Sequence, residues 1–529
     1  MSRARPDSHP PADRRAETEP APGAGTERAE VAAPRGRAQL RRAVTRGVRD
    51  NMIAEILAQA VRVGGLMVLA RALRPEDFGL LRVLLVITVF AALASEAGVP
   101  DAFVQRKQVT DEHEAAAWWL GLGLAVSAAA LLYAAAPALA ALMKMPRLCE
   151  GARLLCLPIV LEGSAVAAGA RLRRRLSFGA LAAADVAAEV AFLITAMVLL
   201  WRGLPMWSLP GALAARLATH ALALWVADPQ LPRALPSGPA IGDFAPFAAT
   251  VSGGRLMNLL SANADYLLVG RLLGDGALGF YSMAWDLLRF VPDRLHRVAG
   301  QVAFPAFCRI QDDRAGLARA YSEFFDYTGL IVLPIAVVGA LAAPEILQTL
   351  YGPQWTPAVT PMRLLAAGLA LRGMRLGIGA VYFSRNRPAF DIYLHGVRFA
   401  LIVAAVWGCA RWGLFGVSAG MSVAEGVVSV MGVALACTLL EIPAGALVRA
   451  AAPAVWLAVL CGLCTFAGRA AAMAAGWHGV PLLAAAALPA AIAWAWMERA
   501  RIAAMFAQGS ACASEPPLAR AAHPVVGLR

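Results

Sequence analysis

The stretch that decides the fold is LARALRPEDFGLL at residues 69–81, because 200 residues later the chain reads VGRLLGDGALGFY at residues 269–281. Arg71, Leu73 and Gly79 of the first copy return at the same spacing in the second copy. In both copies an apolar stretch of transmembrane length precedes the motif and another follows it, which indicates a short loop between two helices. The sequence therefore predicts an internally duplicated bundle of membrane helices, an arrangement typical of transporters.

The composition is that of a membrane protein. Of 529 residues, 59% are hydrophobic and only 16% are charged, values that soluble globular domains of this size do not normally show. The formal net charge of +13 comes mostly from arginines in two polar tails and in short loops between apolar runs. Basic residues in such places set membrane topology and contact lipid head groups. We therefore expect the lipid bilayer as a partner and no nucleic acid.

The apolar segments predict an all-α polytopic membrane protein. We count about fourteen segments of roughly 20 residues, each long enough to cross a hydrocarbon core of about 30 Å. The predicted spans are 51–73, 80–99, 115–143, 151–170, 179–201, 207–227, 245–271, 277–301, 323–350, 358–384, 389–410, 414–437, 450–471 and 479–499.

The position of the repeat predicts how these spans are organised. Six spans separate the two copies of the motif, an even number, so the two halves are expected to be parallel repeats of six helices each. Arginines concentrate before the first span and in alternate loops, which places both termini in the cytoplasm by the positive-inside rule. The expected divisions are a disordered cytoplasmic tail (1–48), two six-helix bundles (49–240 and 241–440), an accessory helix pair (441–502) and a second disordered cytoplasmic tail (503–529).

Four strings in this chain resemble a known family. They are LARALRPEDFG (69–79), DAFVQRKQVTDEHEAAAWW (101–119), the run from ANADYLLVGR to FPAFCRIQDD (262–313) and YGPQWTPAV (351–359). In this order and spacing they resemble the Wzx-type oligosaccharide flippases, the polysaccharide-transport branch of the multidrug/oligosaccharidyl-lipid/polysaccharide (MOP) exporter superfamily. The resemblance implies a V-shaped, MATE-like pair of bundles in a bacterial inner membrane, with a central cavity that opens alternately to either side. It also implies a cargo, a polyprenyl-diphosphate-linked oligosaccharide that moves from the inner to the outer leaflet.

Polar residues on one face of the first span are candidates for handling such a cargo. Glu55, Gln59 and Arg62 are spaced i, i+4 and i+7, so they share one helical face. Arginine suits a diphosphate because its planar fork donates paired hydrogen bonds and keeps its charge. Charged groups at membrane depth are costly and rarely face lipid. We interpret Arg62 and Gln59 as cavity residues and Glu55 as a candidate for binding a coupling ion, H⁺ or Na⁺.

The seventh span, the counterpart of the first in the repeat, carries a similar stripe. Arg255, Asn258 and Asp265 share a face of the expected helix. We interpret Arg255 and Asn258 as cavity residues and Asp265 as a second coupling-ion candidate. The alternative for Arg255, as for Glu55, is that the residue lies near the end of its helix and extends its charge to the membrane interface.

Two further pairs of charged residues lie in other spans. Arg372 and Arg375 are about one turn apart in the tenth span, with Tyr382 near the same face, and we interpret both arginines as cavity residues. The alternative is that they pair with acidic residues elsewhere in the bundle. Asp185 and Glu189 in the fifth span lie close to the RLRRRL segment, so we expect them to pair with arginines at the interface.

Two other classes of protein remain open at this point. A drug or other small-molecule antiporter of the same superfamily would share the fold, but a cavity for organic cations should be dominated by carboxylates and aromatics. A membrane glycosyltransferase or ligase would need a cluster of catalytic carboxylates or histidines, and no catalytic site, metal site or cofactor motif can be assembled from this chain. The polysaccharide polymerase machinery is a possible partner of a flippase, and the identity of the glycan is not encoded in any of these motifs.

Overall fold

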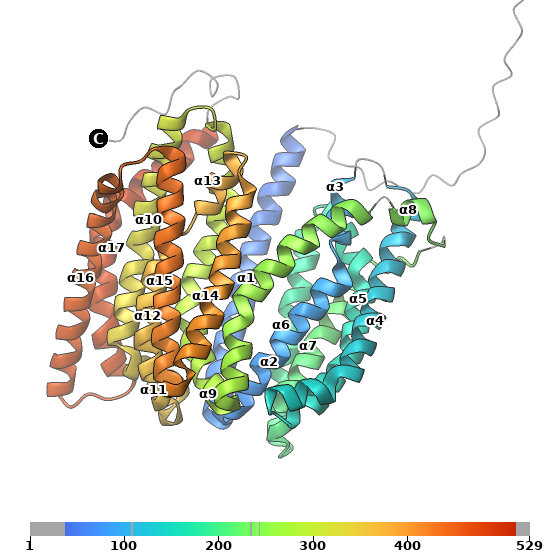
Figure 1. Cartoon of the computed structure of the whole chain (residues 1–529), viewed down its shortest axis with the longest axis horizontal. Helices are drawn as coiled ribbons and strands as arrows, with labels where there is room; N and C mark the ends of the chain where they lie inside the picture. The colour runs from blue at the N-terminus through green and yellow to red at the C-terminus, as the bar shows by residue number, and fades with distance from the viewer. Residues whose placement is uncertain (1–36, 107–108, 233–234, 243, 515–529) are drawn as a thin grey trace, which may run out of the picture.

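The computed structural model describes residues 37–106, 109–232, 235–242 and 244–514, and these residues form helices with no β-strand among them. Figure 1 shows two groups of upright helices side by side, with α1 and α9 between them. The expected fold class, an all-α polytopic membrane protein, is confirmed.

The first group runs from α1 to α8. Its bounds are α1 (Arg37–Ala72), α2 (Pro75–Glu96), the short α3 (Val99–Gln105), α4 (Asp111–Met143), α5 (Arg147–Arg174), α6 (Phe178–Trp201), α7 (Pro205–Ala227) and the short α8 (Gly238–Gly242).

The second group begins with α9, which is shared between the two. Its bounds are α9 (Ala245–Arg309), α10 (Arg314–Leu341), α11 (Ala343–Tyr351), the 3₁₀ turn η1 (Pro353–Ala358), α12 (Val359–Gly373), α13 (Ile378–Ser384), α14 (Pro388–Cys409), the 3₁₀ turn η2 (Ala410–Trp412), α15 (Gly413–Leu440), α16 (Ala444–Ala474) and α17 (Val480–Ser514).

Ten helical stretches in the described part of the chain are long and apolar enough to cross a membrane. The spans expected from the sequence lie in helical parts of the chain, but 323–350 is divided between α10 and α11, and 358–384 is broken by a turn between α12 and α13. The number fourteen itself stays a prediction. Helix α1 begins at Arg37, inside the segment 1–48 expected to be a tail, and α17 extends to Ser514. The alanines, arginines and leucines there are good helix formers, so the helices continue past the apolar runs. Residues 1–36 and 515–529 lie outside the described part.

The two copies of the repeated motif form the turns after α1 and inside α9. In the first copy Pro75 begins α2, and the Asp77 carboxylate accepts a hydrogen bond from the Arg74 backbone N–H at 3.1 Å. In the second copy the chain kinks at Gly274, whose φ of +88° is readily accessible only to glycine. We refer to this end of the bundles as the α11 end and to the opposite one, at the top of Figure 1, as the α3 end.

The two copies pack directly against each other, and the contact is reciprocal. A methyl group on Gly79 would lie 2.0 Å from the Asp275 carbonyl oxygen, and one on Gly279 would lie 1.9 Å from the Pro75 carbonyl oxygen. Exchanging each residue for the one at the same position in the other copy, 200 residues away, turns either contact into the other. The motifs therefore meet about a local two-fold axis, as the same patch does in a symmetric dimer, and only glycine permits the approach.

An aromatic cluster closes the α11 end beside this contact. The Trp355 ring is fully buried and makes edge contacts with Phe78, Phe280 and Tyr351 at centroid distances of 5.2, 5.9 and 6.2 Å. Its indole N–H donates to the carbonyl oxygen of Ala70, at the end of α1, at 2.8 Å. Because these residues come from α2, α9, α11 and η1, the cluster joins the two groups of helices.

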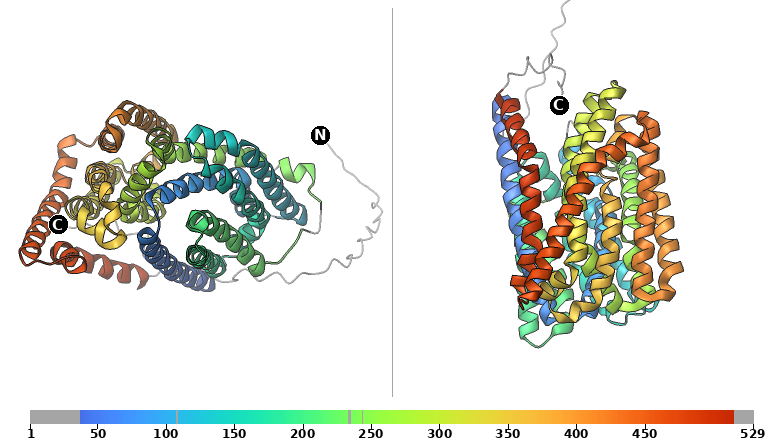
Figure 2. Two further views of the ribbon diagram at one scale, coloured as in Figure 1. Left: turned by 90° about the horizontal axis from the view of Figure 1, so that it is seen from below. Right: turned by 90° about the vertical axis from the view of Figure 1, so that its left-hand side faces the viewer.

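Helices α16 and α17 pack on the outer side of the second group, at its far edge in Figures 1 and 2. The Trp494 indole N–H donates to the Leu330 carbonyl of α10 at 2.9 Å. Arg469 of α16 forms an ion pair with the buried Glu345 of α11 at 2.5 Å. This pair of helices is therefore anchored to α10 and α11.

Candidate substrate cavity

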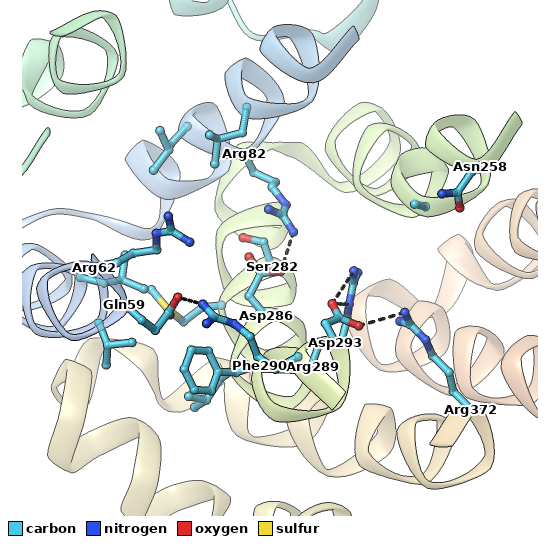
Figure 3. A pocket seen from close by; sticks show the side chains of 18 of the residues that line it. Gln59, Arg62, Arg82, Asn258, Ser282, Asp286, Arg289, Phe290, Asp293 and Arg372 are labelled. Atoms are coloured by element: carbon cyan, nitrogen blue, oxygen red, sulfur yellow. Dashed lines mark hydrogen bonds and ion pairs between the residues drawn. The ribbon is translucent and has the colours of Figure 1, made fainter. Parts of the chain in front are cut away.

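A cavity of about 1260 Å³ lies between the two groups of helices and is partly open to the outside. Its lining comes from helices α1, α2, α6, α7, α9, α12, α13 and α14. Toward the α11 end, Phe78 and Tyr351 of the aromatic cluster also line it. Figure 3 shows polar side chains from α1, α2, α9 and α12 pointing into a shared space.

Cations outnumber anions on the cavity wall. In the described part of the chain the lining contains eight arginines and four carboxylates, so its formal charge is positive. The arginines are Arg62, Arg82, Arg216, Arg289, Arg294, Arg372, Arg375 and Arg398, and the carboxylates are Glu189, Asp286, Asp293 and Asp391.

On the side of the first group, one buried carboxylate holds two arginines. Glu189 of α6 is 5% exposed and accepts hydrogen bonds from Arg62 of α1 and, at 3.0 Å, from Arg216 of α7. The expectation that Glu189 pairs with the RLRRRL segment at the interface was therefore wrong. The i, i+4 spacing places Asp185 and Glu189 on one face of α6 and was a signal of an intramembrane site. The sequence could not show that the two carboxylates have different partners.

Helix α1 is joined to α9 across the cavity wall by Arg294. The Arg294 guanidinium forms an ion pair with Glu55 at 2.7 Å and donates a hydrogen bond to Gln59. Gln59 lines the cavity, as expected, whereas Glu55 lies outside the lining and its carboxylate is paired with Arg294. Arg294 was not singled out from the sequence, although a charged residue inside the predicted span 277–301 was a signal that could have identified it.

The wall formed by α2 and α9 carries a second arrangement. Arg82 forms an ion pair with Asp286 at 2.5 Å, and its guanidinium lies 3.7 Å from the centre of the Tyr266 ring. The Tyr266 hydroxyl donates to the same carboxylate at 2.9 Å. A cation over an aromatic face is stabilised by the ring quadrupole, so Arg82 is held in one orientation.

Two arginines on the side of the second group share a single carboxylate. Arg289 and Arg372 each approach Asp293 at 3.0 Å, as Figure 3 shows. The Nη1 atom of Arg372 is buried and has no hydrogen-bond partner among the described residues. A buried donor without a partner is costly, so this guanidinium has capacity for a further acceptor.

Arg375 has a different environment although it lies one turn away. It reaches Glu425 of α15 at 3.4 Å, and Arg398 binds the same carboxylate at 2.6 Å. Glu425 is 1% exposed and lies behind the cavity wall, whereas both arginines line the cavity. The Tyr382 hydroxyl points away and donates to the Gly432 carbonyl at 2.9 Å, so the expectation that it shares the arginine face was wrong.

The stripe expected on the seventh span is divided by the structure. Asn258 lines the cavity, but Arg255 does not and pairs with Asp101 of α3 at 2.8 Å, close to the α3 end. Asp265 is 1% exposed, lies outside the lining and accepts a hydrogen bond from the Tyr281 hydroxyl at 2.9 Å. Its Oδ1 atom is buried without a hydrogen-bond partner. All three residues precede the kink at Gly274, and over the ten positions that separate them α9 meets different neighbouring residues, which sequence spacing does not report.

No group of three or more His, Cys, Asp or Glu side chains in the described part of the chain is arranged to hold a metal ion. The polar groups of the cavity are arginines, carboxylates, the amides of Gln59 and Asn258, the Ser282 hydroxyl and the His395 imidazole. Such a surface can bind an anion by charge and by paired hydrogen bonds, with the carboxylates as exchangeable counter-ions.

Comparison with known sequences identifies a family. The sequence model of the family described as "Polysaccharide biosynthesis protein" matches residues 68–360, more than half of the chain. The lipopolysaccharide biosynthesis protein WzxC of Escherichia coli (strain K12) is 24% identical over 72% of this chain and 78% of its own length. The succinoglycan biosynthesis transport protein ExoT of Rhizobium meliloti (strain 1021) is 27% identical over 61% of this chain and 65% of its own length.

Solved structures share the fold. The lipid II flippase MurJ in an inward closed conformation superposes with a TM-score of 0.65 at 13% identity, covering 85% of this chain and 99% of that one. An inward-facing multidrug resistance MATE family transporter of the MOP superfamily has a TM-score of 0.59 at 16% identity, covering 73% of this chain and 94% of that one. The MATE-like arrangement implied by the resemblance is confirmed.

Proposed function

Because the chain belongs to the polysaccharide biosynthesis protein family, we propose that it moves a polyprenyl-diphosphate-linked oligosaccharide from the inner to the outer leaflet for surface polysaccharide biosynthesis. The names of its relatives support this: WzxC is a lipopolysaccharide biosynthesis protein and ExoT a succinoglycan biosynthesis transport protein. The protein then acts as a transporter, not as an enzyme.

The observation that carries the proposal is the excess of arginine on the cavity wall. Eight arginines against four carboxylates favour an anionic cargo over a cationic one. A diphosphate that must cross the hydrocarbon region needs such a surface, because an isolated charge in a low-dielectric medium is strongly destabilised. The alternative, a drug antiporter of the same superfamily, fits an organic cation less well because the surplus charge has the wrong sign.

Arg289 and Arg372 are the pair best placed to receive the diphosphate. They share Asp293, and Arg372 retains an unpartnered buried donor. A phosphate that displaces Asp293 would gain paired hydrogen bonds from both guanidinium groups. Arg62, Arg375, Gln59 and Asn258 line the same cavity and complete the polar surface for the head group.

The two groups of helices also suggest how the protein carries out its transport cycle in the membrane. Cargo access alternates between the two sides as the two groups of helices rock against each other, which opens and closes the contact at the α11 end. Asp265 remains the candidate for a coupling H⁺ or Na⁺, because it is buried with an unpartnered oxygen, while Glu55 already holds Arg294. We place the protein in a bacterial inner membrane with both termini in the cytoplasm and the polysaccharide polymerase machinery as a partner.

The test compares two arginine substitutions in cells that lack the chromosomal copy of this protein. Arg372→Gln should cause lipid-linked oligosaccharide to accumulate in the inner leaflet, because it removes one half of the proposed diphosphate site. Arg411→Gln is the matched control, since Arg411 is exposed and stacks on Trp412 outside the cavity. Leaflet distribution is measured with a membrane-impermeant reagent that modifies the sugar. A normal distribution with Arg372→Gln at equal protein levels would contradict the assigned site, and a normal distribution in the deletion strain would contradict the function.

A further inference from the structure

Three titratable side chains from three helices of the first group meet within the membrane-spanning segments, outside the cavity lining. They are Glu162 of α5, Asp185 of α6 and His220 of α7, and we call them the His220 cluster. The His220 Nδ1 atom lies 2.9 Å from Glu162 Oε1 and 3.1 Å from Glu162 Oε2. Its Nε2 atom lies 3.6 Å from Asp185 Oδ1. Each ring nitrogen therefore faces a carboxylate.

This geometry favours a bound proton. A neutral imidazole has one N–H donor and one lone pair, so one of the two carboxylates would face a lone pair, whereas the imidazolium ion donates from both nitrogens. The contact of Nδ1 with Glu162 is a direct hydrogen bond, which leaves no space for a metal ion between the two groups. The His220 cluster carries one net negative charge with the proton bound and two without it.

The His220 cluster lies one helical turn from two arginines of the cavity wall. Asp185 and Glu189 are spaced i and i+4 on α6, and so share a face. Arg216 and His220 have the same spacing on α7. The contact of Glu189 with Arg216, at 3.0 Å, is therefore one rung between the two helices, and the contact of Asp185 with His220 is the next. Glu189 also holds Arg62, and both arginines line the cavity.

We propose that the His220 cluster is a proton-binding site that controls how strongly Arg62 and Arg216 attract the anionic head group, an inference that rests on the proposed function. When the proton leaves, Asp185 loses its cationic partner and the cluster gains a negative charge one turn from the two arginines. That charge attracts the guanidinium groups and opposes the approach of an anion. Proton binding and anion binding therefore favour each other, and linkage makes this effect equal in both directions.

Charged side chains on α1, α2, α6 and α7 also act on the His220 cluster. They are Glu55 and Arg62 of α1, Glu96 of α2, Glu189 of α6 and Arg216 of α7. Glu55 and Glu189 are each paired with arginine, whereas Glu96 acts on the cluster through Glu162. Because carboxylates also bind protons, assigning the proton to the imidazole requires variants that change one group at a time.

The test measures the affinity of the purified full-length protein for inorganic pyrophosphate from about pH 5 to about pH 9, which brackets the titration of histidine. His220→Gln removes the titrating ring and leaves both carboxylates. The wild type should bind pyrophosphate about tenfold more tightly than His220→Gln at the acidic end, a usual size for a coupling between two sites. At the basic end the two affinities should be equal. Titration of the probe and of the cavity residue His395 is common to both proteins and cancels in their ratio.

His478→Gln is the matched control, because His478 is exposed in the turn between α16 and α17 and lies outside the cavity lining. Its affinity should equal that of the wild type at every pH. Calorimetry in two buffers of different ionisation enthalpy provides a second readout. Near neutral pH the wild type should take up protons when pyrophosphate binds, and His220→Gln should take up fewer.

Asp185→Asn keeps the histidine and removes one of its two counter-ions. The change in pyrophosphate affinity should then occur at lower pH, because the imidazolium ion is less stabilised. A purely structural role of the cluster would instead change the affinity by the same factor at every pH. This variant keeps the inference testable if His220→Gln does not fold.

A wild-type to His220→Gln affinity ratio that stays constant across the pH range would overturn the inference and leave the proposed function intact. The same conclusion would follow if His478→Gln reproduced the pH dependence of His220→Gln, since the effect would then not be local to the cluster. If pyrophosphate binds the wild-type protein at no pH, the proposed anion site itself fails and this inference fails with it.

Discussion

At the scale of single residues, the cavity is organised by carboxylates that each hold two arginines. Glu189 holds Arg62 and Arg216, and Asp293 holds Arg289 and Arg372. Placing one anion between two cations lowers their mutual repulsion and leaves a net positive charge for a ligand. The carboxylates therefore set how strongly the arginines attract an anion.

Glu189→Gln tests this role. Without the carboxylate, Arg62 and Arg216 lose their counter-ion, and we expect pyrophosphate to bind about tenfold more tightly, which corresponds to about 1.4 kcal/mol. Transport should slow, because release of the head group becomes less favourable. Titration calorimetry with pyrophosphate measures the affinity.

Glu345→Gln is the control for that experiment. Glu345 is also buried and paired with an arginine, but it lies outside the cavity lining. A gain in affinity shared by both variants would show that the effect is not local to the cavity.

At the scale of elements, the repeated motif has a role in packing. Its two glycines let the α2 and α9 backbones approach so closely that a methyl group at either position would meet a carbonyl oxygen at about 2 Å. Arg71 of the first copy, which corresponds to Arg271 of the second, donates hydrogen bonds to the carbonyl oxygens of Thr349 and Leu350 at the end of α11. The motif therefore joins the two groups of helices at the α11 end.

Gly279→Ala should separate α2 from α9 at this contact. Because the new methyl group meets backbone and not a flexible side chain, the two groups must move apart there, and the α11 end of the cavity should open. We expect a cysteine at position 350, in a background without native cysteines, to react several-fold faster with an impermeant maleimide.

Gly123→Ala provides the comparison, since a methyl group on Gly123 of α4 would meet nothing within 4 Å. Size-exclusion chromatography shows whether the Gly279→Ala protein is folded. If the folded variant reacts with maleimide no faster than the parent protein, the glycine contact does not determine closure of the cavity at the α11 end.

At the scale of the whole molecule, the two groups of helices enclose one cavity and meet at its α11 end. Alternating access requires that this contact opens in one state and closes in another. Glu76 and Gly276 occupy equivalent positions in the two motif copies, and a methyl group on Gly276 would lie 3.6 Å from the Glu76 Cγ atom. Because Cγ occupies about the place of a cysteine Sγ atom, cysteines at the two positions can reach each other.

A Glu76→Cys and Gly276→Cys pair should therefore lock the two groups together when oxidised. We expect transport in proteoliposomes to fall to background after oxidation and to recover after reduction. Each single cysteine variant, treated with the same oxidant, should keep its activity. Full transport with a complete crosslink would contradict rocking of the two groups.

The sequence alone determined the membrane class, the helices and the duplication, because each depends on local composition or on a spacing along the chain. It also identified Gln59, Arg62, Asn258, Arg372 and Arg375, which line the cavity, since charged and amide groups rarely face lipid. It also placed Arg255 with them, whereas that side chain lies outside the lining and pairs with Asp101. Which polar face turns inward depends on helix tilt and on partners far away in the chain.

Only the tertiary structure decided the pairing of charges and the shape of the spaces between helices. Glu189 meets Arg62 across 127 residues and Arg294 meets Gln59 across 235 residues, distances over which periodicity carries no information. The same holds for the reciprocal glycine contact between the two copies of the motif. Helical spacing specifies the face on which a side chain lies, whereas the packing of whole helices determines what that face meets.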